Sequence, residues 1–190
     1  MNKDDEIKKA ILLAAKHVFQ KWGLNKTTME DIAHDAGKGK STLYYYYKSK
    51  EEIFEAATNE ELNNIAIRVR AIIEQIKSPK EKLKRYIAIT LTEIKKTTSI
   101  YPLVKGEIKG NTKFIDKIRK QLDNREEAIV KEILKQGINS NEFNFLKEEQ
   151  LDKAANVIVG IIRGLELYLF LEMDDEEKID IITSLITEGL

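Results

Sequence analysis

Apolar residues recur along most of this chain at the three- and four-residue spacing of an α-helix. The first such face covers residues 4–22 and consists of Ile7, Ile11, Ala14, Ala15, Val18 and Trp22. Comparable faces run through residues 83–94, 114–134, 151–169 and 179–186. No stretch alternates between apolar and polar residues for long enough to require a strand. The pattern therefore predicts an all-α fold of about nine helices.

Residues that begin and end helices interrupt this pattern. Four pairs of a capping residue and an acid three positions later predict helix starts. They are Thr27 with Glu30, Ser49 with Glu52, Ser78 with Glu81, and Asp174 with Glu177. Pro79 suits the first turn of its helix, where its missing N–H needs no partner. Gly23 and Gly137 are predicted to end the helices that precede them.

The segment from Thr27 to Phe54 is the most informative about function. It predicts a short helix ending near residue 36, a turn over residues 36–38 and a second short helix. Gly37 stands where a helix-turn-helix needs a backbone of positive φ. In the second helix Leu43 and Tyr47, four residues apart, are expected to pack inward. Ser41 and Tyr45 then point to the opposite side.

Residues 44–47 are four consecutive tyrosines, and they cannot all be buried. At about 100° per residue they cover most of the helix circumference. Tyrosine hydroxyls and the lysines beside them can bind phosphate, and the outermost side chains can reach base edges in the major groove. The alternative is a tyrosine-rich amphipathic helix with solvated lysines.

The charge is unevenly distributed, although the formal net charge is zero. Residues 1–50 contain ten lysines against six acids, and the rest of the chain carries the compensating excess of acids. A basic head on an acidic body suggests that the head meets phosphate. Hydrophobic residues make up 42% and charged residues 34% of the chain, a balance that indicates a globular protein.

Other classes of protein are disfavoured by what the sequence lacks. The chain has no cysteine, which excludes disulfides, thiolate zinc sites and a cysteine nucleophile. Acids at positions 4–6 stand where a signal peptide would be basic. The longest uncharged stretch of the C-terminal half, residues 154–162, is far shorter than the roughly twenty residues of a membrane span. We therefore expect a soluble, cytoplasmic protein without a membrane partner.

Residues 36–54, AGKGKSTLYYYYKSKEEIF, resemble the recognition segment of the TetR family of one-component transcriptional repressors. The order upstream is also similar, with Trp22-Gly23, then Thr27-Thr28, then Asp31-Ile32-Ala33. Two positions depart from the family pattern. Lys38 stands where the family prefers an apolar turn residue, and Gly39 stands where it prefers a serine cap.

The resemblance implies a homodimer that binds a palindromic operator in double-stranded DNA and is released by a small-molecule effector. It implies a helix-turn-helix DNA-binding domain over residues 1–50 and a ligand-binding and dimerisation domain over residues 51–190. The side chains that it implies at the major groove are Lys40, Ser41, Tyr44 and Tyr45. Those that it implies at the DNA backbone are Thr27, Thr28, Thr42, Tyr46, Lys48 and Lys50. Lys38, which departs from the family pattern, is expected to add a further phosphate contact.

The resemblance also suggests roles for residues of the body. Tyr86, Thr90, Phe114 and Gln121 belong to helices that line an effector cavity in such proteins. Arg163 and Glu166 lie in a mostly apolar helix, where a buried charge needs a partner from the protein or from the ligand. We expect the effector to be apolar or amphipathic.

The last two long helices, about residues 148–172 and 174–188, would form the dimer interface. Gly160 and Gly164 would let a second helix approach closely. The residues expected at this interface are Ile158, Ile162, Leu165, Leu169, Ile179, Ile182, Leu185 and Ile186. The alternative is that both helices cover the core of their own chain.

An enzyme is one alternative function. Asp31 and His34 have the spacing of half a helical metal site, but di-metal helical proteins need such pairs on two helices. No phosphate-binding glycine loop or nucleophile elbow is present. We therefore expect no catalysis, no metal and no cofactor apart from the effector. A helical interaction protein that does not bind DNA is the second alternative, and it leaves the tyrosines beside the lysines unexplained.

Overall fold

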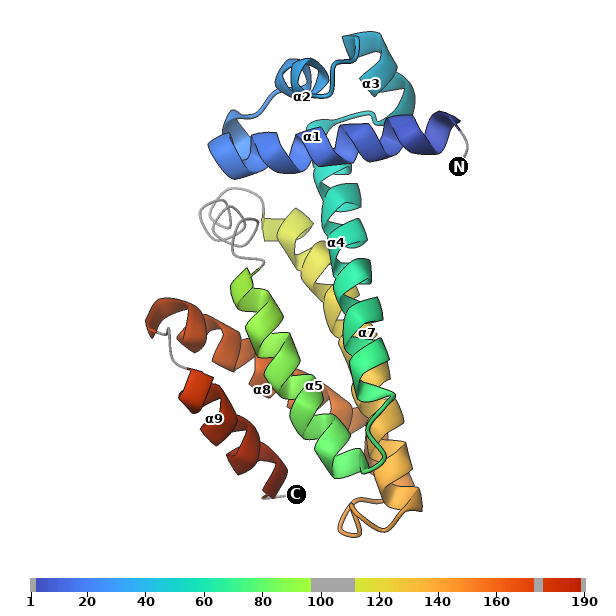
Figure 1. Cartoon of the computed structure of the whole chain (residues 1–190), viewed down its shortest axis with the longest axis vertical. Coiled ribbons are helices and arrows are strands. Elements are labelled where there is room, and N and C mark those ends of the chain that lie inside the picture. Colours follow the sequence, from blue (N-terminus) through green and yellow to red (C-terminus); the bar gives the residue numbers. More distant parts are fainter. Residues whose placement is uncertain (1–2, 97–111, 173–175, 189–190) are drawn as a thin grey trace. The chain divides into compact units, whose positions relative to one another are not determined.

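The computed structural model describes residues 3–96, 112–172 and 176–188, and all the regular elements in these ranges are helical (Figure 1). They are α1 (Lys3–Lys26), α2 (Met29–Asp35), α3 (Lys40–Tyr46), α4 (Lys50–Ile73), α5 (Pro79–Lys96), α7 (Thr112–Asn139), the short 3-10 helix η1 (Glu148–Gln150), α8 (Leu151–Glu172) and α9 (Glu176–Glu188). The all-α prediction is confirmed. The described ranges hold eight α-helices, against about nine expected.

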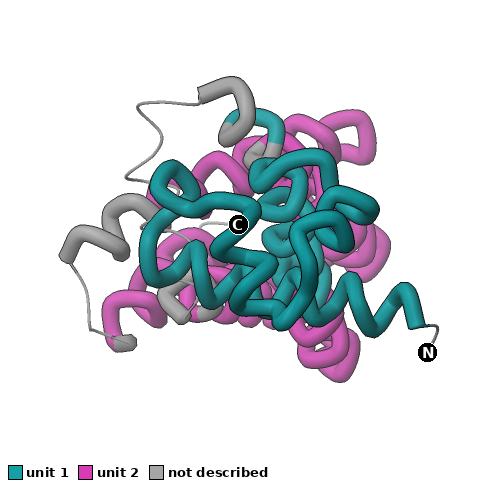
Figure 2. The backbone as a smooth tube through the Cα atoms, turned by 90° about the horizontal axis from the view of Figure 1, so that it is seen from above, with its two compact units in different colours: residues 1–64, 97–118 teal, residues 65–96, 119–190 magenta. Residues whose placement is uncertain are grey.

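The chain divides into two compact units (Figure 2). The first comprises residues 1–64 and 97–118, and the second comprises residues 65–96 and 119–190. The first unit thus extends beyond the helix-turn-helix segment. The predicted domain boundary at residue 50 stays a prediction, because compactness alone does not define a domain.

The first unit is built around α1, with α2 and α3 lying on the same side of it (Figure 1). Its core combines apolar residues of α1, α2, α3 and the start of α4, among them Ile11, Phe19, Ile32, Leu43 and Phe54. The Phe19 and Phe54 rings meet edge to face with their centroids 5.2 Å apart. This contact fixes the start of α4 against α1 and so supports the helices that carry the tyrosine run.

The structure bears differently on two predictions for this unit, the helix end at Gly23 and the helix cap at Thr27. Gly23 does interrupt the first helix, since its φ of 78° lies in the left-handed region, although one more turn follows to Lys26. The predicted cap at Thr27 is wrong by one residue. Thr28 is the N-cap of α2 and forms a reciprocal capping box with Asp31. Thr27 is only 1% exposed, and its hydroxyl donates to the Gly23 carbonyl at 2.7 Å.

The second unit has its own apolar core, with α5 packed against α8 and α9 (Figure 1). Tyr86, Ile87 and Leu91 of α5 are buried there together with residues of α7, α8 and α9. The predicted cap at Ser78 is confirmed, because its hydroxyl accepts the Glu81 N–H at the start of α5. The cap predicted at Ser49 is confirmed in the same way by the Glu52 N–H of α4. Asp174 lies outside the described residues.

The predicted helix end at Gly137 is wrong. The helix α7 continues to Asn139, and the chain then turns through Asn141, whose φ is 60°. Gly137 has another role, because a Cβ atom there would collide with the ring of Phe143. Phe143 is fully buried. Glycine is therefore required at this position for close packing of a side chain and not for ending the helix.

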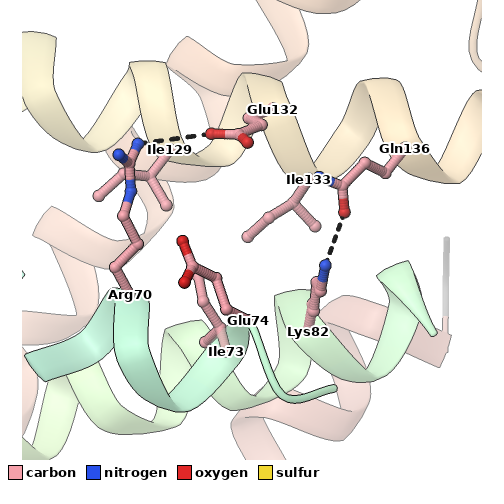
Figure 3. Close-up of a pocket in the computed structure, with 8 residues that line it drawn as sticks. All are labelled: Arg70, Ile73, Glu74, Lys82, Ile129, Glu132, Ile133 and Gln136. Atoms are coloured by element: carbon pink, nitrogen blue, oxygen red, sulfur yellow. Dashed lines mark hydrogen bonds and ion pairs between the residues drawn. The ribbon is translucent and has the colours of Figure 1, made fainter. Parts of the chain in front are cut away.

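A shallow groove lies between the end of α4, the start of α5 and α7, all within the second unit (Figure 3). Ile73, Ile129 and Ile133 contribute its apolar surface. Its rim is polar: Arg70 lies 3.4 Å from Glu132, and Lys82 donates to Gln136 at 2.8 Å. None of the six predicted effector residues is among those that line this groove. Across the described ranges, no helix has both the length and the apolar character needed to cross a membrane.

Candidate nucleic-acid interface

The link between α2 and α3 is a tight turn that depends on Gly37. Its φ is 60°, a region that side chains other than glycine rarely adopt. The Lys38 N–H then donates to the Ala33 carbonyl at 2.9 Å, and the Gly37 N–H donates to the His34 carbonyl at 3.1 Å. The turn therefore closes back on the last residues of α2, and Lys38 stays exposed. The helix-turn-helix geometry predicted for this segment is present.

Helix α3 has one buried side and one solvent side. Leu43 is fully buried and Tyr47 is 9% exposed, as the four-residue spacing predicts. On the other side Tyr45 is 79% exposed, Tyr44 is 47% exposed, and Ser41 is also exposed. The predicted orientation of the tyrosine run is confirmed. A large aromatic surface beside polar side chains therefore faces solvent at the outermost part of α3.

The start of α3 reflects one departure from the family pattern. Gly39 is the N-cap, with an extended backbone and no side-chain hydrogen bond to the helix. A Cβ at this position would make only ordinary contacts with the Ser41 and Thr42 hydroxyls. Nothing steric in the described structure therefore requires glycine here.

Lys40, at the first position of α3, has two partners in this unit. It forms an ion pair with Glu30 in the first turn of α2, and its ammonium lies 5.8 Å from the centre of the Tyr44 ring. The hydrogen bond from Lys40 holds the pKa of the Glu30 carboxyl below its ordinary value. Both side chains remain more than half exposed. A phosphate that approached Lys40 would have to compete with this carboxylate.

Tyr46 likewise has an acidic partner. Its hydroxyl donates to the Asp4 carboxylate in the first turn of α1 at 2.7 Å. This bond is the main reason that the pKa of Tyr46 rises to about 12. The Tyr46 ring meets that of Tyr45 edge to face, with 4.9 Å between centroids, and the Lys8 ammonium lies 5.9 Å from its centre. The N-terminal turn of α1 is therefore part of this surface.

Two residues predicted to contact the DNA backbone have other roles. Lys50 donates to the carbonyls of Asn25 and Thr27 at 3.1 and 2.9 Å, which ties the end of α1 to the start of α4. The Thr27 hydroxyl is buried on the Gly23 carbonyl. Both side chains are thus held by backbone carbonyls at or just after the end of α1. Because both side chains already have partners within the chain, we propose neither residue as a phosphate contact.

The other predicted contacts are distributed around α3. Thr28 is exposed, but its hydroxyl is engaged in the capping box with Asp31. Lys48 is exposed, and Thr42 is half-buried. Sequence reasoning missed Asp4 and Glu30 as members of the surface. Glu30 could have been found from the turn geometry, whereas Asp4 lies 42 positions from Tyr46 and gave no local signal.

The half metal site suggested by Asp31 and His34 is not assembled. Asp31 accepts the N–H and the hydroxyl proton of Thr28, both within 2.9 Å. The other histidine, His17, pairs with Asp35 at 2.9 Å. Within the described ranges, no group of three or more histidine and acidic side chains could hold a metal ion.

Comparison with known proteins finds a family model and several regulators that are similar to this segment. Residues 11–57 match the family model described as bacterial regulatory proteins, tetR family. The transcriptional regulator RutR of Escherichia coli is 37% identical over 84 residues, which are 44% of this chain and 39% of RutR. The regulator QacR of Staphylococcus aureus is 29% identical over 162 residues, which are 82% of this chain and 84% of QacR. The similarity to the TetR family model therefore covers the helix-turn-helix segment of this chain.

Solved structures extend the similarity to the whole fold. The structure of the transcriptional regulator FadR from Bacillus subtilis in complex with stearoyl-CoA superposes with a TM-score of 0.78. It covers 96% of this chain and 98% of FadR at 21% identity. At that identity the match speaks for the fold alone. The relatives named here are regulators, which agrees with the expectation that this chain is not an enzyme.

The residues predicted to bind an effector have different surroundings in the structure. Tyr86 and Thr90 are buried in α5. The Gln121 side-chain oxygen is buried and has no hydrogen-bond partner among the described residues. Arg163 is held by Asp123 and Glu126 of α7, each at 2.8 Å, so the protein itself supplies the partner of this charge. The side chains of Phe114 and Glu166 lie outside the described part of the structure.

The residues predicted for the dimer interface also differ in burial. Ile158, Ile162 and Ile179 are buried in the core of their own chain, because they lie on the inner faces of α8 and α9. Leu165, Ile182 and Ile186 are partly buried against the same core, and the Leu169 side chain lies outside the described part. Of the predicted set, Leu185 stands out at 72% exposed.

A different set of α8 and α9 residues faces outward. Val157, Ile161, Ile181 and Leu185 are exposed, and Gly160 and Gly164 lie between them on the same side of α8 with open space where a Cβ would be. The residues of α8 repeat at intervals of three and four and so share one face. We call these six residues the outer α8–α9 face.

Proposed function

We propose that this chain is a ligand-responsive transcriptional regulator, a repressor that binds a palindromic DNA operator as a homodimer. The observation that carries the proposal is the solvent side of α3, where Lys40, Ser41, Tyr44 and Tyr45 are exposed together. Leu43 and Tyr47 hold this side outward. A short helix presented in this way by a tight turn is the arrangement that reads base edges in the major groove.

Contacts to the DNA backbone would come from the margin of the same surface. Lys38 in the turn and Lys48 after α3 are exposed lysines that can neutralise phosphates. Thr28, Thr42 and Tyr46 offer hydroxyl groups beside them, although those of Thr28 and Tyr46 have partners within the chain. The proposed DNA contacts therefore form a central group that reads bases and a surrounding group that positions the helix on the DNA backbone.

The outer α8–α9 face supports the homodimer. It joins four exposed apolar side chains to two glycines that would let a second helix approach closely. On α8 the exposed apolar positions and the glycines share one side of the helix, and exposed apolar surface of this kind indicates an interface. In a two-fold dimer the two copies of α3 would be about 34–36 Å apart, one turn of the double helix.

Release by a small molecule would be a shift between two conformations of the body. Gln121 is the most informative candidate contact, because a buried polar atom without a partner costs about 1–3 kcal/mol that a ligand could offset. Tyr86 and Thr90 lie in the apolar core of the same unit, which suits an apolar or amphipathic effector.

The function can be tested by titrating the protein onto a labelled duplex taken from upstream of its own gene. Fluorescence anisotropy at two salt concentrations should show tight, steeply salt-dependent binding that exceeds binding to random DNA. Tyr45→Ala should lower the affinity for that duplex by about 1–3 kcal/mol. Trp22→Ala removes another exposed aromatic side chain of this unit and should leave the affinity unchanged.

The alternative is a helical interaction protein that does not bind DNA in a sequence-specific way. It predicts no preference for any duplex and no effect of Tyr45→Ala. If the protein binds no duplex even at low salt, the regulator is excluded and this alternative takes its place.

A further inference from the structure

Two of the groups expected to hold DNA already have carboxylate partners within the chain. The Lys40 ammonium pairs with Glu30, and the Tyr46 hydroxyl donates to Asp4. The two acids come from different helices, α2 and α1, and both reach α3. All four side chains belong to the first compact unit.

These contacts are exposed, so DNA can replace them without unfolding anything. Each side chain of the Lys40–Glu30 pair is more than half exposed, and the Tyr46–Asp4 bond is also at the surface. A carboxylate and a phosphate are both anions that accept strong hydrogen bonds from the same donors. The carboxylates therefore compete with backbone phosphates for Lys40, at the start of the base-reading helix, and for Tyr46.

We propose that Glu30 and Asp4 are built-in competitors of the DNA backbone, which hold Lys40 and Tyr46 until phosphate displaces them and thereby limit affinity for DNA of any sequence. This inference rests on the proposed function. The chain supplies the competing groups itself, so the restraint acts without an effector.

The expected size of the effect follows from the exposure of the pairs. Exposed ion pairs are weak, and their removal changes an equilibrium by a factor of about two to five. Because exposed charges are screened by salt, the effect should also shrink as ionic strength rises. If the competition is local, the effect of removing Glu30 must depend on Lys40, and the effect of removing Asp4 must depend on Tyr46.

The test measures binding of the full chain to a labelled random duplex by fluorescence anisotropy at low and at physiological salt. Glu30→Gln should tighten binding about two- to fivefold at low salt and less at physiological salt. Asp35→Asn is the matched control, since it removes the same charge from the same helix but from a residue that pairs with His17. It should change the affinity much less.

The partner dependence is measured in two double variants. Glu30→Gln should have little effect once Lys40→Ala is present, because no ammonium is left to compete for. In the same way, Asp4→Ala should tighten binding on its own and have little effect in a Tyr46→Phe background. Circular dichroism of each variant establishes that it is folded.

The outcomes separate the inference from the function on which it rests. If the unaltered chain binds duplex and Glu30→Gln changes affinity no more than Asp35→Asn, the competition is refuted and only general electrostatics remains. The competition is also refuted if Glu30→Gln changes the affinity equally in the unaltered chain and in the Lys40→Ala background. If neither the unaltered chain nor any variant binds duplex, the regulator and the inference fail together.

Discussion

Lys48 precedes α4 and Lys50 is its first residue, yet the two side chains have different surroundings. Both are lysines beside the tyrosine run, so both were expected at the DNA backbone. In the structure Lys48 is exposed, whereas Lys50 bonds the carbonyls of Asn25 and Thr27. These carbonyls are more than twenty positions away, and residue-by-residue reasoning from a motif cannot detect such a contact.

The two lysines should therefore respond differently to substitution. Lys50→Ala should destabilise the chain by about 1 kcal/mol, because it removes charge-assisted hydrogen bonds at partly exposed groups. It should leave the salt dependence of DNA binding unchanged. Lys48→Ala should leave stability unchanged and reduce the slope of log affinity against log salt by about one. Chemical denaturation and anisotropy titrations measure the two effects, and an unaltered slope for Lys48→Ala would contradict its assignment.

At the scale of single helices, the apolar periodicity predicted the elements well, and the capping residues predicted several starts. The errors are instructive. Thr27 and Thr28 each have an acid three positions later, so the sequence contains two overlapping capping boxes, and burial of Thr27 decides between them. Gly137 was expected to end a helix because local rules treat glycine as a stop signal. Its actual constraint comes from Phe143 across the following turn.

Substitution of Gly137 by alanine should change stability in the direction opposite to the usual one for a glycine within a helix. In the interior of a helix, Gly→Ala normally stabilises by about 1 kcal/mol. Here Gly137→Ala should destabilise by about 1–3 kcal/mol, because the new methyl group collides with a fully buried ring. Denaturant unfolding measures the change. In a Phe143→Ala background the same substitution should cost much less, and an equal cost in both backgrounds would show that the ring is not responsible.

Glu142 joins two helical segments and should make stability depend on pH. Its carboxylate accepts the Ser78 hydroxyl at 2.5 Å and the Lys80 N–H at 3.0 Å at the start of α5. The Ser78 hydrogen bond is the main cause that holds the pKa of Glu142 below its ordinary value of 4.5. The folded state thus favours the ionised form, and this stabilisation is present above pH 4.5 and is lost as pH falls through the lowered pKa.

Thermal unfolding of Glu142→Gln tests this sign. The variant should melt at a lower temperature than the unaltered chain near pH 7, and the difference should shrink as the pH falls below 4.5 and through the lowered pKa, where the carboxylate of the unaltered chain takes up a proton. Glu149→Gln, at an exposed position of η1, serves as the control and should show no such trend. A difference that grew on acidification would contradict the assignment.

At the scale of the whole molecule, the sequence predicted a basic head and a helical body, but not which side of the last two helices faces outward. Apolar residues occur on more than one side of α8, so their periodicity alone could not separate the core from an interface. Burial makes the distinction, because it places Ile158 and Ile162 inside and Val157 and Ile161 outside. The partners of Arg163 lie 37 and 40 positions away and were equally beyond sequence reasoning.

The outer α8–α9 face should determine the oligomeric state. Leu185→Lys should shift the protein from dimer to monomer, because a charge introduced into the proposed apolar interface would be left without a partner. Analytical ultracentrifugation over a range of concentrations measures the shift. Ile67→Lys, at an apolar position of α4 that is 67% exposed, is the matched control and should leave the mass unchanged. A Leu185→Lys protein that remained fully dimeric would place the interface elsewhere.

The ion pair between Lys40 and Glu30 has a consequence for how quickly a target is found. A regulator meets a vast excess of random DNA before its operator, and non-specific dissociation constants are about 10⁻⁴–10⁻⁶ M at physiological salt. A carboxylate that recaptures the lysine shortens each stay on random DNA, so the protein returns sooner to solution and samples more positions in a given time. The dwell time on random DNA would thus be set partly by one acidic residue at the start of α2.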